Sequence, residues 1–269
     1  MADPRPIGIF DSGVGGLTVA RAIWASLPNE SVVYVGDAAH FPYGPKSLEE
    51  IRGYAMDIAA YLVDRSVKLL VVACNSVEVS AIGDIAAAAE VPVVGVIGPG
   101  VRAALRATRN GVIGVLGTEA TIRTGGYQRA VGSAATLRPA ACPVFVEHVE
   151  RGDTTSPELR EAAAGYLAPL KEMDVDTVIL GCTHYPLLSG LLQVELGPDV
   201  VLVSSAEETA KDVYAELLGA DALREDAEPP HHAFVTTGDA EAFRDLAELF
   251  LGREVAHVDA VHVETGGRE

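Results

Sequence analysis

The sequence is short of basic and aromatic side chains, and it has no long apolar run. Of its 269 residues, 20 are Lys or Arg against 38 Asp or Glu, the formal net charge is −18, and 6% are aromatic. This deficit of basic charge disfavours direct contact with nucleic acid or an anionic membrane. No window offers about 18 consecutive apolar residues, so no membrane span is predicted. An anionic small substrate is still compatible with this net charge, because backbone N–H groups at helix N-termini make a locally positive site.

Cysteine and lysine are also scarce. Three cysteines cannot all pair within one chain, which argues against a disulfide framework. No lysine lies in a motif that indicates a Schiff base, so a pyridoxal-phosphate enzyme is disfavoured. Residues 1–6 lack a basic segment followed by an apolar one. We therefore predict no signal peptide and expect a cytoplasmic protein.

Ala, Val, Leu and Ile are abundant, and they form strand-like and helix-like segments in turn. The predicted strands of the first part of the chain are residues 7–10, 31–35, 69–73 and 93–96. The predicted helices between and after them are residues 17–27, 47–65, 80–89 and 99–106. The C-terminal part predicts helices at 208–217 and 240–251, strands at 233–236 and 255–263, and a frayed end at 266–269. This alternation predicts an α/β protein with doubly wound parallel sheets.

The pattern restarts near Gly111, which indicates an internal repeat. Residues 9–12 match residues 115–118 at an offset of 106, and residues 32–44 roughly match residues 143–152. Any α/β protein repeats strand and helix, but a matching pair of cysteines described below favours a real repeat. We therefore expect two pseudo-symmetric α/β lobes with the active site in the cleft between them. The predicted lobes are residues 1–98 with 207–269, and residues 99–206.

Two short apolar runs each end in a cysteine followed by small polar residues. One leads to Cys74, and the other, 108 residues later, leads to Cys182. Because ligands bind outside the carboxyl ends of parallel strands, both thiols are expected in the cleft. The position of Cys74 at a helix start predicts a lowered thiol pKa, and His184 could stabilise a thiolate at Cys182. Inert core cysteines are the alternative, and a zinc site is weakly indicated without further Cys or His ligands.

Other segments indicate a function less specifically than the two cysteine motifs do. A glycine-rich turn follows the first strand, and Asp11 either caps the next helix or lies in the cleft. This turn is not a dinucleotide fingerprint, because its third glycine position is Thr18. The turn at residues 41–44 could line a pocket. Cys142 is expected to be structural, and residues 231–232, both His, are expected to be solvated.

Two opposed thiols can do what one cannot. One thiol can remove a proton from one face of a carbon atom while the other returns a proton to the opposite face, which inverts the stereocentre through a planar carbanion. The α-proton of an amino acid is weakly acidic, so hydrogen-bond donors must stabilise charge on the substrate carboxylate. Hydroxyl and amide groups beside the two cysteines are suitable donors.

The motifs of the chain resemble those of the glutamate racemase family. The matching stretches are IGIFDSGVGGLTV (7–19), YVGD (34–37), PYG (42–44), ACNS (73–76), VIGVLGTEATI (112–122) and ILGCTHYPLL (179–188). The resemblance implies two α/β lobes and an enzyme that interconverts L- and D-glutamate without cofactor or metal. It also implies a role in supplying D-glutamate for bacterial peptidoglycan and cell-wall synthesis, and a homodimer.

Carried over residue by residue, the resemblance implies roles for particular side chains. Cys74 would act as acid/base on D-glutamate and Cys182 on L-glutamate, assisted by Asp11 and His184. Glu150 matches an acidic position near the substrate ammonium. The implied substrate contacts are Asp11, Ser12, Tyr43, Gly44, Asn75, Ser76, Thr118, Thr121, Glu150, Thr183 and His184.

The chain departs from the family pattern in two places. Glu78 follows the first cysteine motif and is expected to bring a charge close to the anionic substrate. Residues 37–41 also differ, so the pocket wall is expected to differ. Three other functions stay open: a related racemase acting on aspartate or another carbon acid, a family member that inhibits DNA gyrase through protein contact, and a redox pair formed by Cys74 and Cys182.

Overall fold

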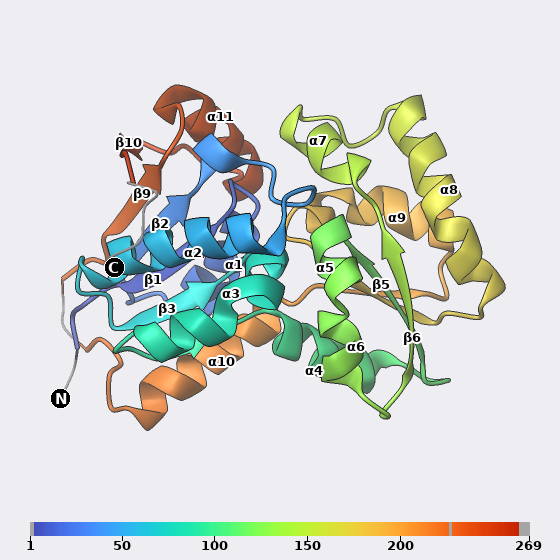
Figure 1. Cartoon of the computed structure of the whole chain (residues 1–269), viewed down its shortest axis with the longest axis horizontal. Coiled ribbons are helices and arrows are strands. Elements are labelled where there is room, and N and C mark those ends of the chain that lie inside the picture. The colour runs from blue at the N-terminus through green and yellow to red at the C-terminus, as the bar shows by residue number, and fades with distance from the viewer. Residues whose placement is uncertain (1–2, 226–227, 264–269) are drawn as a thin grey trace.

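Two parallel β-sheets flanked by helices make up two lobes of the chain (Figure 1). The structure is a computed structural model, and it describes residues 3–225 and 228–263. The N-terminal part of the first lobe contains β1 (Ile7–Asp11), α1 (Leu17–Ser26), β2 (Val32–Gly36), a 3-10 turn η1 (Ala38–His40), α2 (Leu48–Val63), β3 (Leu69–Val72), α3 (Asn75–Ala88) and β4 (Val93–Val94). The C-terminal part of the chain adds α10 (Ala206–Gly219), β9 (His232–Thr236), α11 (Ala240–Leu251) and β10 (Asp259–Ala260) to this lobe.

The second lobe is built from the middle of the chain. Its first elements are α4 (Ile97–Ala107), β5 (Val112–Gly117), α5 (Glu119–Thr124), α6 (Gly126–Val131), β6 (Thr136–Ala141) and α7 (Val144–Glu150). Its last elements are α8 (Pro157–Glu172), β7 (Thr177–Gly181), a 3-10 turn η2 (Tyr185–Leu188), α9 (Ser189–Leu196) and β8 (Val201–Val203). The chain passes from the first sheet to the second, and back again, near the predicted lobe boundaries. The exact end residues of the two lobes stay a prediction.

The two sheets repeat one topology. The first has the order β10-β9-β2-β1-β3-β4 and the second β6-β5-β7-β8, so β1 corresponds to β5 and β3 to β7. This agrees with the predicted pair of pseudo-symmetric lobes. The predicted match of residues 32–44 with 143–152 is wrong, because β2 corresponds to β6 and residues 144–150 form helix α7. Strand β6 lies at a sheet edge and is largely exposed, so it has no apolar alternation to reveal it.

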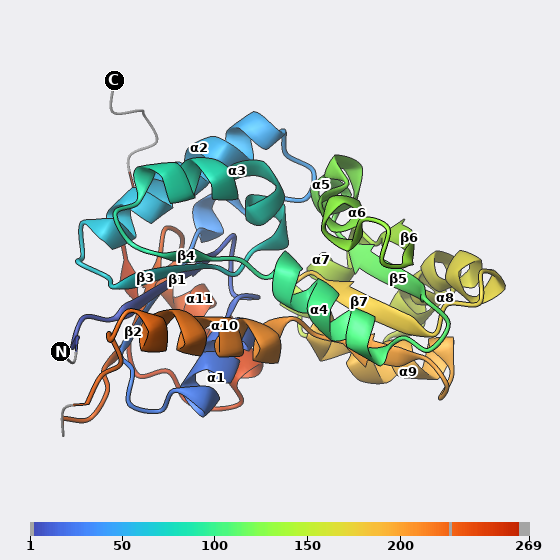
Figure 2. The same cartoon turned by 90° about the horizontal axis from the view of Figure 1, so that it is seen from below.

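Helices cover both faces of the first sheet, as a doubly wound fold requires. Figure 2 shows α2 and α3 on one side of the sheet and α1 and α10 on the other. Side chains of successive strand residues point to opposite faces. Ile7 and Ile9 therefore join the core on the side of α1, while Phe10 joins the core on the side of α2. Burial on both faces explains why these strands are continuous apolar runs.

Two predicted elements and one predicted side-chain environment need correction. Helix α3 begins at Asn75 rather than at residue 80, because the polar residues after Cys74 form its first turn. Strand β10 covers only two residues of the predicted 255–263. His232 is not solvated but half-buried against the Trp24 ring, with ring centroids 4.8 Å apart, and burial lowers its pKa to about 4. The end predicted to fray, 266–269, lies outside the described residues.

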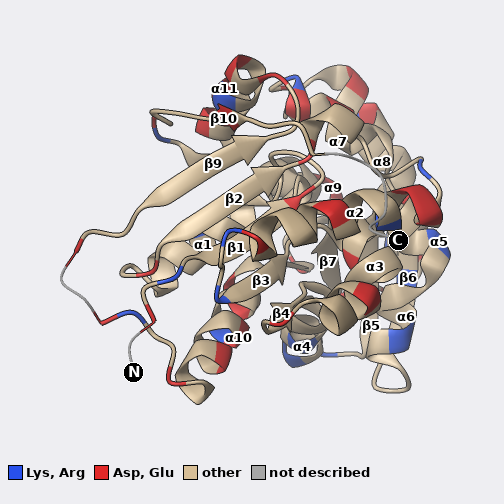
Figure 3. Cartoon of the chain, turned by 60° about the vertical axis from the view of Figure 1, so that its left-hand side comes forward, with Lys and Arg blue, Asp and Glu red and all other residues tan. Residues whose placement is uncertain are grey.

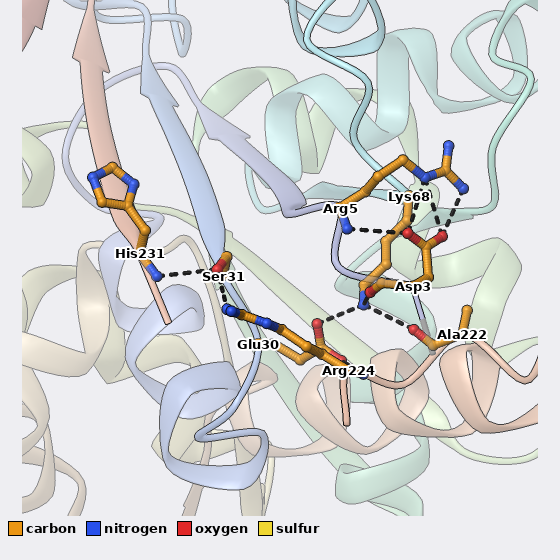
Figure 4. A network of polar contacts seen from close by, with 8 residues as sticks. All are labelled: Asp3, Arg5, Glu30, Ser31, Lys68, Ala222, Arg224 and His231. Atoms are coloured by element: carbon orange, nitrogen blue, oxygen red, sulfur yellow. Dashed lines mark hydrogen bonds and ion pairs between the residues drawn. The ribbon is translucent and has the colours of Figure 1, made fainter. Parts of the chain in front are cut away.

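A buried ion pair joins separate segments at the amino ends of the strands in the first lobe (Figure 4). Lys68 Nζ lies 2.6 Å from Glu30 Oε2, and the two side chains are 0% and 2% exposed. Lys68 also donates to the carbonyl oxygens of Asp3 at 2.7 Å and Ala222 at 2.8 Å. Glu30 Oε1 accepts from the Arg224 N–H at 2.8 Å. This network, Lys68 with Glu30 and their three partners, ties the segment after α10 to the first lobe.

Charge is distributed over the helices of both lobes. Figure 3 shows Asp and Glu on α2, α10 and α11, with Lys and Arg interspersed. Several of these residues form exposed ion pairs, such as Arg52 with Asp84 and Arg102 with Asp212. No helix within residues 3–225 and 228–263 is long and apolar enough to cross a membrane.

Candidate active site

One cavity of about 150 Å³ lies where the two lobes meet, and both predicted catalytic thiols line it. The predicted residues that line it from the first lobe are Ser12, Tyr43, Gly44, Cys74, Asn75 and Ser76. Those from the second lobe are Thr118, Cys182, Thr183 and His184. The turn at residues 41–44 also contributes Phe41 and Pro42. None of the lining residues in the described part of the chain is Lys or Arg, so a bound anion would depend on neutral donors and on His184.

Cys74 sits at the N-cap of α3 and faces Ser12, to whose Oγ its thiol donates at 3.7 Å. Burial raises the pKa of the Cys74 thiol above its usual range, and the Asp11 carboxylate raises it further. The Val77 N–H and the Ser12 hydroxyl act in the opposite direction but are outweighed. The predicted lowering of this pKa by the helix N-terminus is therefore wrong. At neutral pH Cys74 carries its proton.

Cys182 lies in a different electrostatic environment, next to a histidine. The Cys182 Sγ atom is 3.9 Å from His184 Nδ1, and His184 Nε2 is 2.9 Å from Glu150 Oε1. Burial alone would lower the pKa of His184, but its contacts with Cys182 and Glu150 raise that pKa to about 10. His184 is therefore held as an imidazolium beside the Cys182 sulfur.

The glycine-rich turn after β1 brings the two lobes into contact. Asp11 is buried, and its carboxylate accepts from the Gly13 N–H at 3.2 Å and from the Thr183 hydroxyl at 3.4 Å. Thr18 in turn donates to the Thr183 carbonyl oxygen at 3.2 Å. A Cβ atom at Gly15 would lie 2.3 Å from Thr183 Oγ1 and 2.4 Å from His184 Nδ1. Only glycine permits this close approach between the turn and the Cys182 segment.

The first turn of α3 presents polar groups to the cavity and also binds the second lobe. Asn75 Oδ1 accepts from the Tyr127 hydroxyl at 2.8 Å, which leaves its amide nitrogen to donate to a ligand. Ser76 Oγ and Thr118 Oγ1 are 2.8 Å apart across the lobe interface. Thr118 also donates to Thr121 Oγ1 at 3.0 Å. These hydroxyls form a short chain that ends in the cavity.

Tyr43 uses its hydroxyl within the protein. It donates to Asp37 Oδ2 at 2.5 Å, and Asp37 also accepts from the Thr237 hydroxyl at 2.6 Å. Burial, with the Asp37 charge, raises the pKa of Tyr43, so the phenol stays protonated. Tyr43 therefore lines the cavity while Asp37 holds its hydroxyl. The sequence predicted Tyr43 at the pocket but not this partner.

Some predicted residues do not line the cavity. Asp11, Thr121 and Glu150 lie behind the residues that do, and their direct contact with substrate stays a prediction. The expectation that Glu78 brings charge to the substrate is wrong, because its carboxylate turns away and accepts from the N–H groups of Val96 and Ile97. Burial raises the pKa of Glu78 to about 7 even though these two hydrogen bonds lower it. Cys142 is buried and does not line the cavity.

Sequence reasoning missed one wall of the cavity. Pro143, Val146 and Glu147, at the start of α7, and Pro45 and Glu119 line it as well. The wall at α7 follows the exposed edge strand β6, so no apolar run marked its position. Within the described part of the chain, no three His, Cys, Asp or Glu side chains form a group that could hold a metal ion.

Residues 17–213 match the model of the Asp/Glu/hydantoin racemase family. The chain belongs to this family. It is accordingly an isomerase, as the sequence predicted. The matched residues include both cavity thiols and most of the lining described above.

Individual members of the racemase family are similar to the chain over nearly its whole length. It is 54% identical over 260 residues to a glutamate racemase of Mycobacterium tuberculosis, covering 96% of each chain. It is 51% identical over 256 residues to a glutamate racemase of Corynebacterium diphtheriae, covering 94% of this chain and 97% of the relative.

Solved structures show the same fold. A glutamate racemase of Bacillus anthracis superposes with a TM-score of 0.91 at 41% identity, covering 96% of this chain and 98% of that one. A glutamate racemase of Francisella tularensis in complex with D-glutamate superposes with a TM-score of 0.92 at 32% identity, covering 98% and 100%. The predicted fold class is confirmed.

The close approach at Gly15 gives a first prediction for this racemase. Gly15→Ala should lower kcat/KM about 100-fold, because Thr183 and His184 must move by roughly 1 Å to admit the new methyl group. Gly53→Ala is the matched control, since a Cβ atom at Gly53 in α2 meets nothing within 4 Å. The control should keep its activity and gain roughly 0.5–1 kcal/mol of stability. Steady-state kinetics and thermal unfolding of both variants check this, and equal activities would refute the tight contact.

Proposed function

We propose that this enzyme is a glutamate racemase that works with two thiols. The observation that carries the proposal is that Cys74 and Cys182, contributed by different lobes, line one small cavity. Two proton-carrying groups in one site are what inversion of an α-carbon needs. The glutamate racemases similar to the chain support the choice of substrate.

In the direction from L- to D-glutamate, the Cys182 thiolate takes the α-proton of the substrate. The electron pair of the broken C–H bond passes into the carboxylate, which gives a planar carbanion. The Cys74 thiol then donates its proton to the opposite face of the α-carbon. This assignment fits the two environments, because the His184 imidazolium lies against the Cys182 sulfur while burial and the Asp11 charge raise the pKa of Cys74.

The reverse direction uses the same groups in exchanged roles. After one turnover Cys74 is the thiolate and Cys182 carries the proton, so the enzyme is ready to act on D-glutamate. Asp11 lies beside Cys74 and is proposed to assist its proton transfer, as His184 assists Cys182. No proton is gained or lost over the cycle, and no cofactor is needed for the balance.

Neutral donors are proposed to hold the substrate carboxylates. The proposed donors are the Asn75 amide and the Ser12 hydroxyl, together with the hydroxyls of Ser76 and Thr183 once these turn from Thr118 and Asp11 toward the ligand. Donors aimed at a carboxylate stabilise the charge that builds up as the α-proton leaves. Glu150 is proposed to sit near the substrate ammonium while it also holds His184.

Incubation of the reduced enzyme with either pure enantiomer of glutamate tests the proposal. Loss of optical rotation with L- or D-glutamate, and α-deuterium incorporation in D₂O, are the expected results. A matched panel of aspartate and other carbon acids is run alongside. Turnover of aspartate without turnover of glutamate would replace the proposed substrate, and no turnover of any substrate would overturn racemisation.

The wider role follows from this activity and is proposed with it. D-Glutamate made by the enzyme would enter bacterial peptidoglycan, which implies a cytoplasmic enzyme. Expression of the chain in a D-glutamate auxotroph should restore growth without added D-glutamate. The homodimer implied by the resemblance is tested by light scattering of the purified chain.

A further inference from the structure

Glu78 links α3, the helix that follows Cys74, to the other lobe. It lies one turn into α3, and its backbone N–H donates to the Cys74 carbonyl oxygen at 2.9 Å. Its side chain leaves the first lobe and reaches the segment where the chain first crosses between lobes. There Glu78 Oε2 accepts from the N–H of Val96 and, at 2.9 Å, from the N–H of Ile97.

These two N–H groups belong to the N-terminus of α4, the first helix of the second lobe. The N-cap residue of α4 is Val96, which has no side chain able to accept their hydrogen bonds. A helix start leaves such donors without intrahelical partners and carries a partial positive charge. The Glu78 carboxyl therefore caps α4 from the neighbouring lobe. A cap supplied by another segment fixes two elements to each other, whereas a local cap does not.

The sequence around the crossing is adapted to this cap. A Cβ atom at Gly95 would lie 2.5 to 2.6 Å from Cδ and both oxygens of Glu78. The carboxyl group thus occupies the place that any larger residue 95 would need. On the next residue of α3, Val79 lies so close to α6 that a Cβ atom at Gly126 would be 2.5 Å from its Cγ1. Both glycines allow α3 to approach the second lobe.

The first turn of α3 is therefore bound to the second lobe at three points. Asn75 contacts Tyr127 and Ser76 contacts Thr118, as described above, and Glu78 contacts the start of α4. Asn75 and Ser76, which make the first two contacts, also line the cavity and are proposed to bind the substrate. Glu78 does not line the cavity that holds the two thiols but a separate, open pocket between α3, α4 and α6, so of the three it is the one outside the proposed substrate site.

We propose that Glu78 is a positioning residue that holds α3 and α4 together at the lobe crossing and so sets the gap between Cys74 and Cys182. The inference rests on the proposed function, because the gap matters only if both thiols act on one carbon. Thiols that flank one carbon must be held to within a fraction of an ångström, and displacement of about 1 Å can cost 100-fold in rate. A cap at the crossing controls this gap better than a contact at either rim of the cavity.

Substitution of Glu78 gives the test in activity. Glu78→Ala should lower kcat about 10-fold in both directions, while KM changes less than threefold because Asn75 and Ser76 keep their own partners. Glu78→Gln should stay within threefold of the wild-type kcat, since its amide oxygen can still accept from α4. Asp84→Ala is the matched control, because it removes an exposed carboxylate from the same helix and should change neither constant.

A structural readout separates this inference from the proposed function. Backbone hydrogen exchange at residues 96 and 97 should be faster in Glu78→Ala than in the wild type or in Asp84→Ala. Gly95→Ala should displace the carboxyl and lower kcat to a similar extent, and the double variant Glu78→Ala/Gly95→Ala should be no slower than Gly95→Ala alone. These exchange rates test the cap even if the enzyme racemises no glutamate.

The outcomes that would overturn the inference are distinct. Unchanged exchange at residues 96 and 97 in Glu78→Ala would show that the cap does not hold α4. Faster exchange with a kcat equal to that of Asp84→Ala would show that the cap does not set the thiol gap. Thermal unfolding of each variant ensures that the folded enzyme is compared.

Discussion

Replacing either cavity cysteine by serine is expected to lower the rate of racemisation about 1,000-fold or more. A serine hydroxyl keeps the shape of the thiol but is a far weaker acid, so the substituted side chain can neither take nor return the α-proton efficiently. Both Cys74→Ser and Cys182→Ser should fail in both directions, because each turnover needs one thiol on each face. Polarimetry with L- and D-glutamate measures this loss.

The two variants should differ in a half-reaction. With Cys182 intact, Cys74→Ser should still remove the α-proton from the L-enantiomer of a substrate that carries a β leaving group. Expulsion of that group consumes the carbanion, so no second thiol is needed. Cys182→Ser should show the same elimination with the D-enantiomer only. Release of the leaving group from each enantiomer measures this preference.

The third cysteine provides the control. Cys142 is buried as the other two are, but it does not line the cavity. Cys142→Ala should therefore keep kcat within about twofold, since its effect is confined to packing worth roughly 1 kcal/mol. Normal racemisation by either serine variant, or elimination from the same enantiomer by both, would show that the two-thiol mechanism is wrong.

The parts of the fold that could be predicted are those with a local signal. The strands leading to Cys74 and Cys182 are buried on both faces, so their apolar runs marked them and placed the thiols at the carboxyl edges. Strand β6 and the wall formed by α7 had no such signal, because an exposed edge strand can contain Arg138 and Pro139 without penalty. For this reason the counterpart of β2 in the second lobe was predicted at α7, one element after its true counterpart β6.

The site could be predicted by residue type but not by partner. The sequence predicted Tyr43, Glu150 and Glu78 near the substrate, yet the polar group of each side chain forms a hydrogen bond within the protein. These partners are distant in sequence or belong to the other lobe, so no spacing rule reveals them. The same limit applies to the pKa of Cys74, because the helix-end effect is local whereas burial depends on the assembled lobes.

Removal of the Lys68 ammonium is expected to cost about 3–5 kcal/mol of the free energy of unfolding. Lys68→Met leaves the buried Glu30 carboxylate without its counter-charge and the carbonyl oxygens of Asp3 and Ala222 without this donor. For a chain of this size the midpoint of thermal unfolding should fall by roughly 10 °C. Chemical denaturation measures the free energy, and calorimetry measures the midpoint.

Two comparisons show whether the loss comes from an unpaired buried charge. Arg52→Ala removes an exposed ion pair and should cost no more than about 1 kcal/mol. Glu30→Gln added to Lys68→Met should recover part of the loss, because the charge disappears while an oxygen can still accept from the Arg224 N–H. At temperatures below its unfolding transition, Lys68→Met should have normal activity. Lys68 lies at the amino end of β3, whereas Cys74 follows the carboxyl end of that strand. A loss no larger than that of Arg52→Ala would mean that the ion pair does not hold the C-terminal segment to the first lobe.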